Sequence, residues 1–269
     1  MTHPPSLAVE YADPTPLQIR IATHRNHSEQ PDDPIRDVLD MLGLAGAEDI
    51  ADIGCGDGRF LFHVHDNGHT GRLVGVDTSP KMVAATDALP GVTAIIGDAQ
   101  QLPLDDDEFD ICTARHMLYH VPEPLAALSE FKRVTKPGGV VAVVVNHART
   151  CHRTHELVAA HARSHGIAQP TDMMNPAVNS DSLPGMMHDV FGNTAIRTTD
   201  NALVFTQPEP LIAFAEALFT FCGITPDHPS RAKVLDDVTT DIRDWFAAHP
   251  GQRWRDPKGY TVITANVTE

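Results

Sequence analysis

Three glycines at alternate positions, Gly54, Gly56 and Gly58, carry the clearest chemical signal in the chain. They directly follow the apolar run 50–53, and an amphipathic stretch typical of a helix comes after them. Asp57 is placed to cap that helix. A glycine turn between a strand and a helix lets a ligand lie against bare backbone, and the helix start favours its polar or anionic part. The pattern predicts a site for a small molecule that contains a nucleoside.

The spacing of these glycines argues against a dinucleotide. The pyrophosphate fingerprint is Gly-x-Gly-x-x-Gly, in which the last glycine allows close packing of the helix. Here the third glycine comes one residue early, and Arg59 stands where the fingerprint has its last glycine.

Two acids follow the next two apolar runs. Asp77 ends the run 72–77, and an acid at the tip of a second strand accepts hydrogen bonds from ribose hydroxyls. Asp98 and Ala99 follow the run 92–97. A carboxylate and a backbone N–H at that place can read the edge of an adenine.

Charge and composition restrict the expected partners. The 269-residue chain has a formal net charge of −16, so nucleic acid and anionic membrane surfaces are not expected to bind it. No apolar run approaches the ~20 residues of a membrane span, and the first residues lack the features of a signal peptide. The four cysteines form no Cys-x-x-Cys pair, which suits reduced thiols. We expect a cytoplasmic protein with no membrane partner.

Several further motifs complete an ordered set across residues 35–147, and this set resembles the class I S-adenosylmethionine-dependent methyltransferases, of the small-molecule, bacterial type. Beyond residue 147 the match is only to a general outline, and substrate choice is expected to be encoded there. The matching segments are 52–58, 76–82, 97–99, 102–104, 109–110, 116–122 and 131–139.

The resemblance and the alternation of strands with helices imply an α/β fold: a Rossmann-like seven-stranded, mostly parallel sheet with helices on both faces and a helical cap. The expected strands are 50–53, 72–77, 92–97, 109–115, 140–145, 194–205 and 259–267. The expected divisions are an N-terminal lid segment (1–34), the S-adenosylmethionine-binding core (35–147), a helical cap (148–192), a core strand (193–206), a helical cap insertion (207–257) and the last core strand (258–269).

The resemblance also implies S-adenosylmethionine as the cofactor. The acid that matches Asp52 lies near the methionine ammonium in the family, although a buried structural carboxylate is an equal alternative. A lid tyrosine and an arginine for the methionine carboxylate are expected in the N-terminal segment. The expected cofactor-binding residues are Tyr11, Arg20, Asp52, Gly54, Cys55, Gly56, Asp77, Thr78, Met82, Asp98, Ala99 and Arg115.

Methyl transfer is an in-line displacement, so alignment supplies most of the catalysis, ~7–11 kcal/mol. A general base, which adds ~10²–10⁴-fold, is needed only if the nucleophile arrives protonated. The more specific hypothesis is that His116 or His147 acts as this base. That these polar residues only form the wall of the site is an equal alternative. The expected catalytic residues are His116, Tyr119, His120, Asn146 and His147.

Metal binding has to be weighed because the chain has 16 histidines. His147, Cys151 and His155 fall four residues apart, as do His161 and His165, and such pairs on one helix face can bind zinc. The sequence lacks a His-Glu-x-x-His motif, and histidines on a helix surface are usually solvated. We expect no metal.

The leading interpretation is therefore an S-adenosylmethionine-dependent methyltransferase that acts on a small-molecule metabolite, in secondary metabolism. One alternative is a cyclase that forms azetidine-2-carboxylate from the cofactor and releases methylthioadenosine. A second is a non-catalytic module that binds S-adenosylmethionine. The sequence leaves open the acceptor, the atom modified and homodimer formation.

Overall fold

The computed structural model describes residue 9 and residues 15–171 and 174–268. These residues contain a seven-stranded sheet in the order β3-β2-β1-β4-β5-β7-β6. The first five strands are parallel, β7 runs antiparallel to β5, and β6 runs antiparallel to β7. This confirms the expected fold class. The strands are β1 (Ile50–Ile53), β2 (Leu73–Asp77), β3 (Val92–Ile96), β4 (Phe109–Arg115), β5 (Thr135–Asn146), β6 (Ala195–Phe205) and β7 (Trp254–Asn266).

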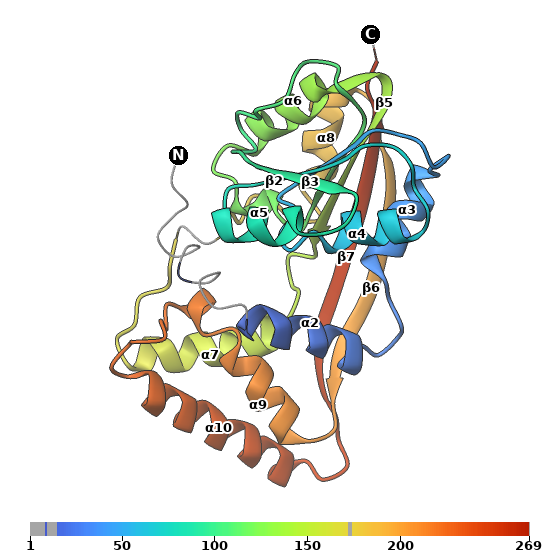
Figure 1. Cartoon of the computed structure of the whole chain (residues 1–269). Coiled ribbons are helices and arrows are strands. Elements are labelled where there is room, and N and C mark those ends of the chain that lie inside the picture. Colours follow the sequence, from blue (N-terminus) through green and yellow to red (C-terminus); the bar gives the residue numbers. More distant parts are fainter. Residues whose placement is uncertain (1–8, 10–14, 172–173, 269) are drawn as a thin grey trace.

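Helices cover both faces of the sheet (Figure 1). Successive side chains of a strand point to opposite faces, so each buried strand feeds two hydrophobic cores. One face packs against α6 (Pro124–Val134) and α8 (Leu183–Phe191). The other packs against α3 (Pro34–Leu42) and α4 (Arg59–Asp66). The helix α5 (Pro80–Asp87) packs against β2 and β3.

Local sequence explains how two of these helices begin. α3 begins after Asp33, whose carboxylate accepts hydrogen bonds from the backbone N–H groups of Ile35 and Arg36. α4 begins after Gly58, which makes no side-chain cap. Gly58, not the predicted Asp57, stands at the N-cap, but the Asp57 carboxylate still accepts a hydrogen bond from the Arg59 backbone N–H at 3.4 Å and pairs with the Arg59 guanidinium at 2.8 Å.

The long strands β6 and β7 leave the core and carry a helical cap at one end of the molecule (Figure 1). The cap has its own hydrophobic core, which includes Val158, Phe214 and Val238. Its helices are α7 (His152–Ser164), α9 (Pro208–Glu216) and α10 (Arg231–Ala248), with a short 3-10 turn, η2 (Thr220–Cys222). The helix α2 (Thr15–His27) packs against α9 and β6.

Two segments differ from the predicted boundaries. α8 lies in the predicted cap segment 148–192, yet it buries Leu183, Met187 and Phe191 in the main core against α6. β7 begins at Trp254, so its first residues pair with the end of β6 inside the cap. Both differences arise from burial against distant elements rather than from local sequence.

Candidate functional site

The turn after β1 leaves backbone accessible at one place. Gly54, Gly56 and Gly58 have φ values of 67°, 57° and 74°, a region that favours glycine. A Cβ added at Gly54 would lie 2.7 Å from the Met117 side chain. A Cβ at Gly56 would meet no described atom within 4 Å. Gly56 therefore provides the bare backbone that a nucleoside-containing ligand requires.

Asp77 joins the end of β2 to this turn. One carboxylate oxygen accepts a hydrogen bond from the Gly56 backbone N–H at 3.0 Å, and the other accepts one from the Ser79 N–H at 2.9 Å. The carboxylate thus lies beside the open backbone at the carboxyl end of the sheet. The neighbouring predicted residues are half-buried: Thr78 lies just before α5, and Met82 lies in its first turn.

The end of β3 lies next to the end of β2, because the Gly97 N–H donates to the Asp77 carbonyl at 3.1 Å. The Asp98 carboxylate accepts a hydrogen bond from the Gln100 N–H at 2.9 Å, so it stabilises its own turn. Ala99 is buried in the main core. The structure therefore places Asp98 and Ala99 on the same edge of the sheet as Asp77 and Gly56.

Asp52 and Arg115 form a buried ion pair on neighbouring strands. A carboxylate oxygen of Asp52 lies 2.9 Å from an Arg115 guanidinium nitrogen, and the Thr113 hydroxyl donates to the other oxygen at 2.7 Å. The guanidinium also lies over the Phe60 ring, 4.3 Å from its centroid. Burial of a charge requires such compensation. The pair holds two predicted cofactor residues together.

Cys55 is unsuited to nucleophilic chemistry. Its burial, together with the nearby carboxylates of Asp52 and Asp77, raises the pKa of the thiol to about 12. The thiol therefore stays protonated at neutral pH, and it packs 3.8 Å from the Thr86 hydroxyl.

Three of the five predicted catalytic side chains lie together. The Asn146 amide donates to the Tyr119 hydroxyl at 3.4 Å, and the ring centroids of Tyr119 and His120 lie 4.7 Å apart. Tyr119 and His120 belong to η1 (Leu118–His120), which follows β4, and Asn146 ends β5. The adjacency of β4 and β5 brings them together.

His116 has an unusual environment. Its φ is 54°, and its ring makes an edge contact with Tyr260, with centroids 6.4 Å apart. The Nδ1 atom is shielded from solvent and has no hydrogen-bond partner among the described residues. Burial, with smaller contributions from the charges of Arg115 and His24, lowers the pKa of His116 to about 4. The imidazole is therefore neutral at physiological pH and can accept a hydrogen bond, while the lowered pKa makes it a weaker base than an exposed histidine.

The side chain of His147 does not join Tyr119 and Asn146. Its Nδ1 lies 3.3 Å from a carboxylate oxygen of Asp200 on β6, and its ring packs against Gly259 of β7. Its backbone N–H also donates to the Gly259 carbonyl at 3.0 Å. The side chain is thus engaged with the antiparallel edge of the sheet rather than with Tyr119 and Asn146.

The N-terminal predictions fall on α2 and on residues before it. Tyr11 lies outside the described residues. Arg20 donates to the Ala217 carbonyl at 2.8 Å and lies over the Phe221 ring, which ties α2 to the cap. His24, one turn further along, is a site candidate that the sequence reasoning missed. No motif marks it, because its position depends on how α2 docks.

The histidines considered for metal binding have acidic partners. His161 and His165 of α7 pair with Asp241 and Asp237 of α10, at 2.8 Å and 2.6 Å. In the part of the chain that the structure describes, no three His, Cys, Asp or Glu side chains are grouped closely enough to hold a metal ion. Within the same residues, no helix is both long and apolar enough to cross a membrane.

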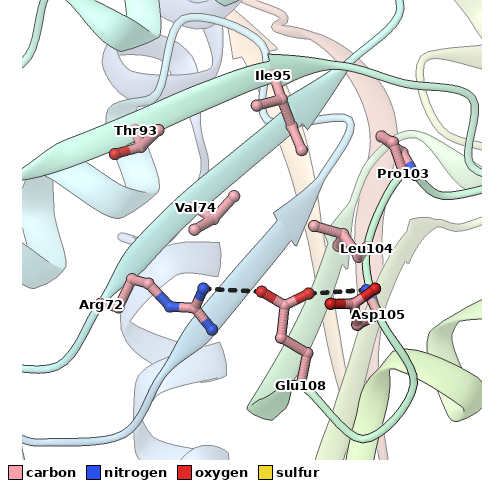
Figure 2. A pocket seen from close by; sticks show the side chains of 8 residues that line it. All are labelled: Arg72, Val74, Thr93, Ile95, Pro103, Leu104, Asp105 and Glu108. Atoms are coloured by element: carbon pink, nitrogen blue, oxygen red, sulfur yellow. Dashed lines mark hydrogen bonds and ion pairs between the residues drawn. The ribbon is translucent and has the colours of Figure 1, made fainter.

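A shallow groove of about 330 Å³ lies away from the glycine turn (Figure 2). It runs along Arg72 and Val74 at the start of β2 and along Thr93 and Ile95 of β3. An ion pair of 2.7 Å between Arg72 and Glu108 crosses it. Its lining residues are Arg72, Val74, Thr93, Ile95, Pro103, Leu104, Asp105 and Glu108.

Comparisons with known proteins agree with this geometry. Residues 51–143 match the family model described as "Methyltransferase domain". The demethylmenaquinone methyltransferase of Staphylococcus saprophyticus is 34% identical over 109 residues, which cover 39% of this chain and 47% of that protein. The chain therefore matches less than half the length of this relative.

Two solved structures share the fold. A protein of Anabaena variabilis, described as a methyltransferase from an antibiotic biosynthesis pathway, superposes with a TM-score of 0.63 at 18% identity, over 86% of this chain and 96% of its own. The [4+2]-cyclase SpnF superposes with a TM-score of 0.60 at 20% identity, over 100% of this chain and 98% of its own. Identities this low show the fold alone. Over residues 51–143 the chain is therefore similar to a methyltransferase domain, a kind of domain whose cofactor is S-adenosylmethionine.

Proposed function

We propose that this chain transfers the methyl group of S-adenosylmethionine to a small-molecule metabolite. One observation carries the proposal: the open backbone of Gly56 lies beside the Asp77 carboxylate at the carboxyl end of the sheet. Ligands of open α/β sheets bind at that end. The open backbone of Gly56 and the Asp77 carboxylate together fit a ligand with a ribose and a polar tail.

The residues that would hold the cofactor come from three strand ends. Asp77 would accept hydrogen bonds from the ribose hydroxyls, and Asp98 with the Ala99 N–H would meet the adenine. The Gly56 backbone would approach the ligand most closely, while the Asp52–Arg115 pair would present a compensated charge to its amino-acid end. The cofactor supplies a methyl group activated by the sulfonium, so the protein mainly has to align it with the acceptor.

Three observations favour a small acceptor. The net charge of −16 repels nucleic acids. The cap packs on α2 and β6 beside the carboxyl ends of the strands, where it would restrict access by a macromolecule. The Staphylococcus relative is named for a small-molecule substrate. A cytoplasmic location is part of the same proposal.

Ligand binding and product analysis test the proposal. S-adenosylmethionine and S-adenosylhomocysteine should raise the melting temperature, because a ligand at 100 times its Kd adds ~2.7 kcal/mol to the stability of the folded state. NAD should not. The turnover product should be S-adenosylhomocysteine. Methylthioadenosine would indicate cyclisation instead, and the absence of either product across an acceptor panel would indicate a binding module.

A further inference from the structure

Thr86 of α5 is completely buried behind the glycine turn. Its hydroxyl donates a hydrogen bond to the Gly56 carbonyl at 2.9 Å. On the other side of the same residue, the Gly56 N–H donates to the Asp77 carboxylate at 3.0 Å. The two peptide groups that flank the Gly56 Cα are therefore each held by a side chain, one from the end of β2 and the other from α5.

Two other glycines make room for Thr86. A Cβ added at Gly58 would lie 2.8 Å from both the methyl carbon and the hydroxyl oxygen of Thr86, which is closer than real Cβ atoms come. A Cβ added at Gly75 of β2 would lie 3.1 Å from the same methyl carbon. Thr86 can therefore reach the turn because Gly58, the third glycine of the motif, has no side chain.

The side of Gly56 that would meet the ligand is open. Its φ is 57°, and an added Cβ would meet no described atom within 4 Å. Side-chain packing therefore does not fix the backbone there, and glycine has more conformations to choose from than any other residue. The two hydrogen bonds to Gly56 have to select one of them. A site whose binding conformation is only partly populated loses affinity by that fraction.

We propose that Thr86 is a positioning residue for the cofactor: its hydroxyl holds the Gly56 turn in the conformation that binds S-adenosylmethionine. This inference rests on the proposed function. Thr86 acts from behind the turn, because it is fully buried and contacts Gly56 through the carbonyl, while the ligand would lie on the open side. It therefore adds affinity without touching the ligand.

Replacements of Thr86 can separate the hydroxyl from the methyl group. Thr86→Val keeps the shape but leaves the Gly56 carbonyl without this donor, whereas Thr86→Ser keeps the donor and loses the methyl group. Isothermal titration calorimetry measures S-adenosylhomocysteine binding. We expect Thr86→Val to weaken it roughly tenfold and Thr86→Ser by less than about threefold, although both lose stability in urea. If Thr86→Val does not fold, Thr86→Ala against Thr86→Ser repeats the comparison, because they differ by the hydroxyl alone.

Thr135 provides the matched control. It is as fully buried as Thr86, and its hydroxyl also donates to a backbone carbonyl, that of Phe131, at 2.7 Å. It begins β5, so it lies at the end of the sheet opposite to the glycine turn. Thr135→Val should therefore lose stability in urea as Thr86→Val does, while its affinity for S-adenosylhomocysteine stays within about twofold of wild type.

Binding kinetics provide a measurement that a general loss of stability would not change. If Thr86→Val lowers only the population of the binding conformation, S-adenosylhomocysteine should associate more slowly and dissociate at the wild-type rate, because the bound turn is the same. Asp77→Ala removes a contact with the ligand itself, so it should raise the dissociation rate. Surface plasmon resonance on the immobilised protein measures both rates.

The outcomes separate the two proposals. Wild-type affinity in Thr86→Val, an equal loss in Thr86→Ser or Thr135→Val, or a loss that lies in the dissociation rate would overturn the inference while the wild-type protein still binds S-adenosylhomocysteine. Failure of S-adenosylhomocysteine to bind the wild-type protein would overturn the proposed function itself, and the inference with it.

Discussion

The Asp77 carboxylate binds the Gly56 N–H at 3.0 Å, so the acid at the end of β2 fixes the turn that follows β1. A ligand on that turn meets the acid and the backbone as one unit. The two residues can therefore be tested separately. A change at Asp77 removes a polar contact with the ligand, and a change at Gly56 fills the space that the ligand would occupy.

Replacing Asp77 by Ala should weaken S-adenosylmethionine binding by ~1.5–3 kcal/mol, or roughly 10- to 150-fold, because a hydrogen bond to a charged group is lost. Isothermal titration calorimetry measures the change. Asp87→Ala is the control, since its carboxylate accepts a bond from the Ala94 N–H at 3.1 Å within α5 and β3. If folded Asp77→Ala binds as tightly as wild type, the ribose assignment is wrong.

Gly56→Val should abolish detectable cofactor binding, because the side chain would fill the open space above the backbone. Gly68→Val separates this effect from backbone strain. Gly68 also has a positive φ, 86°, and its added Cβ meets no described atom within 4 Å, yet it lies in the loop after α4. We expect both variants to lose similar stability in urea denaturation, with binding lost only in Gly56→Val. Equal binding by the two variants would remove Gly56 from the site.

The core could be predicted from the sequence because its signals are local. Each of the first four strands is a short apolar run that ends at a turn or an acid, and burial on both faces of a parallel sheet requires such runs. The glycine turn and Asp77 lie in sequence beside the strands that position them. The fold prediction was therefore confirmed.

The cap and the acceptor side depend on partners far away in sequence. The start of β7 is polar, with Arg255, Asp256 and Lys258, and it was not predicted as strand. Each of these side chains has a distant partner: Arg255 pairs with Glu29, Lys258 with Asp32, and Asp256 accepts hydrogen bonds from the first N–H groups of α7. No local pattern encodes such pairs, and the same holds for the position of His24.

Lys258→Ala should destabilise the protein by ~3–5 kcal/mol, because Asp32 would remain buried without its partner. The double change Lys258→Met with Asp32→Asn should cost less, since neither charge remains. The control is Lys136→Ala. Lys136 and Asp110 also lie 2.8 Å apart, but both side chains are 39% exposed, so the expected cost is ~0–1 kcal/mol. Guanidinium denaturation measures all three. Equal losses for Lys258→Ala and Lys136→Ala would contradict the role of burial.

Stability should fall as the pH drops below neutrality, and His24 and His116 should contribute to the fall. The folded-state pKa of each is lowered to about 4, whereas the unfolded chain has ordinary values near 6.5. Below the unfolded pKa the unfolded state binds more protons, so the contribution is complete above about pH 6.5 and is lost as the pH falls through about 4.

The slope of the unfolding free energy against pH can be measured. Each such histidine adds at most ~1.4 kcal/mol per pH unit to the pH dependence of the unfolding free energy between those values. Denaturant titrations at several pH values should show a shallower slope for His24→Phe and His116→Phe than for wild type. His27→Phe serves as the control on the same helix. Parallel curves for all four proteins would mean that these two imidazoles take up protons as readily in the folded state as in the unfolded chain.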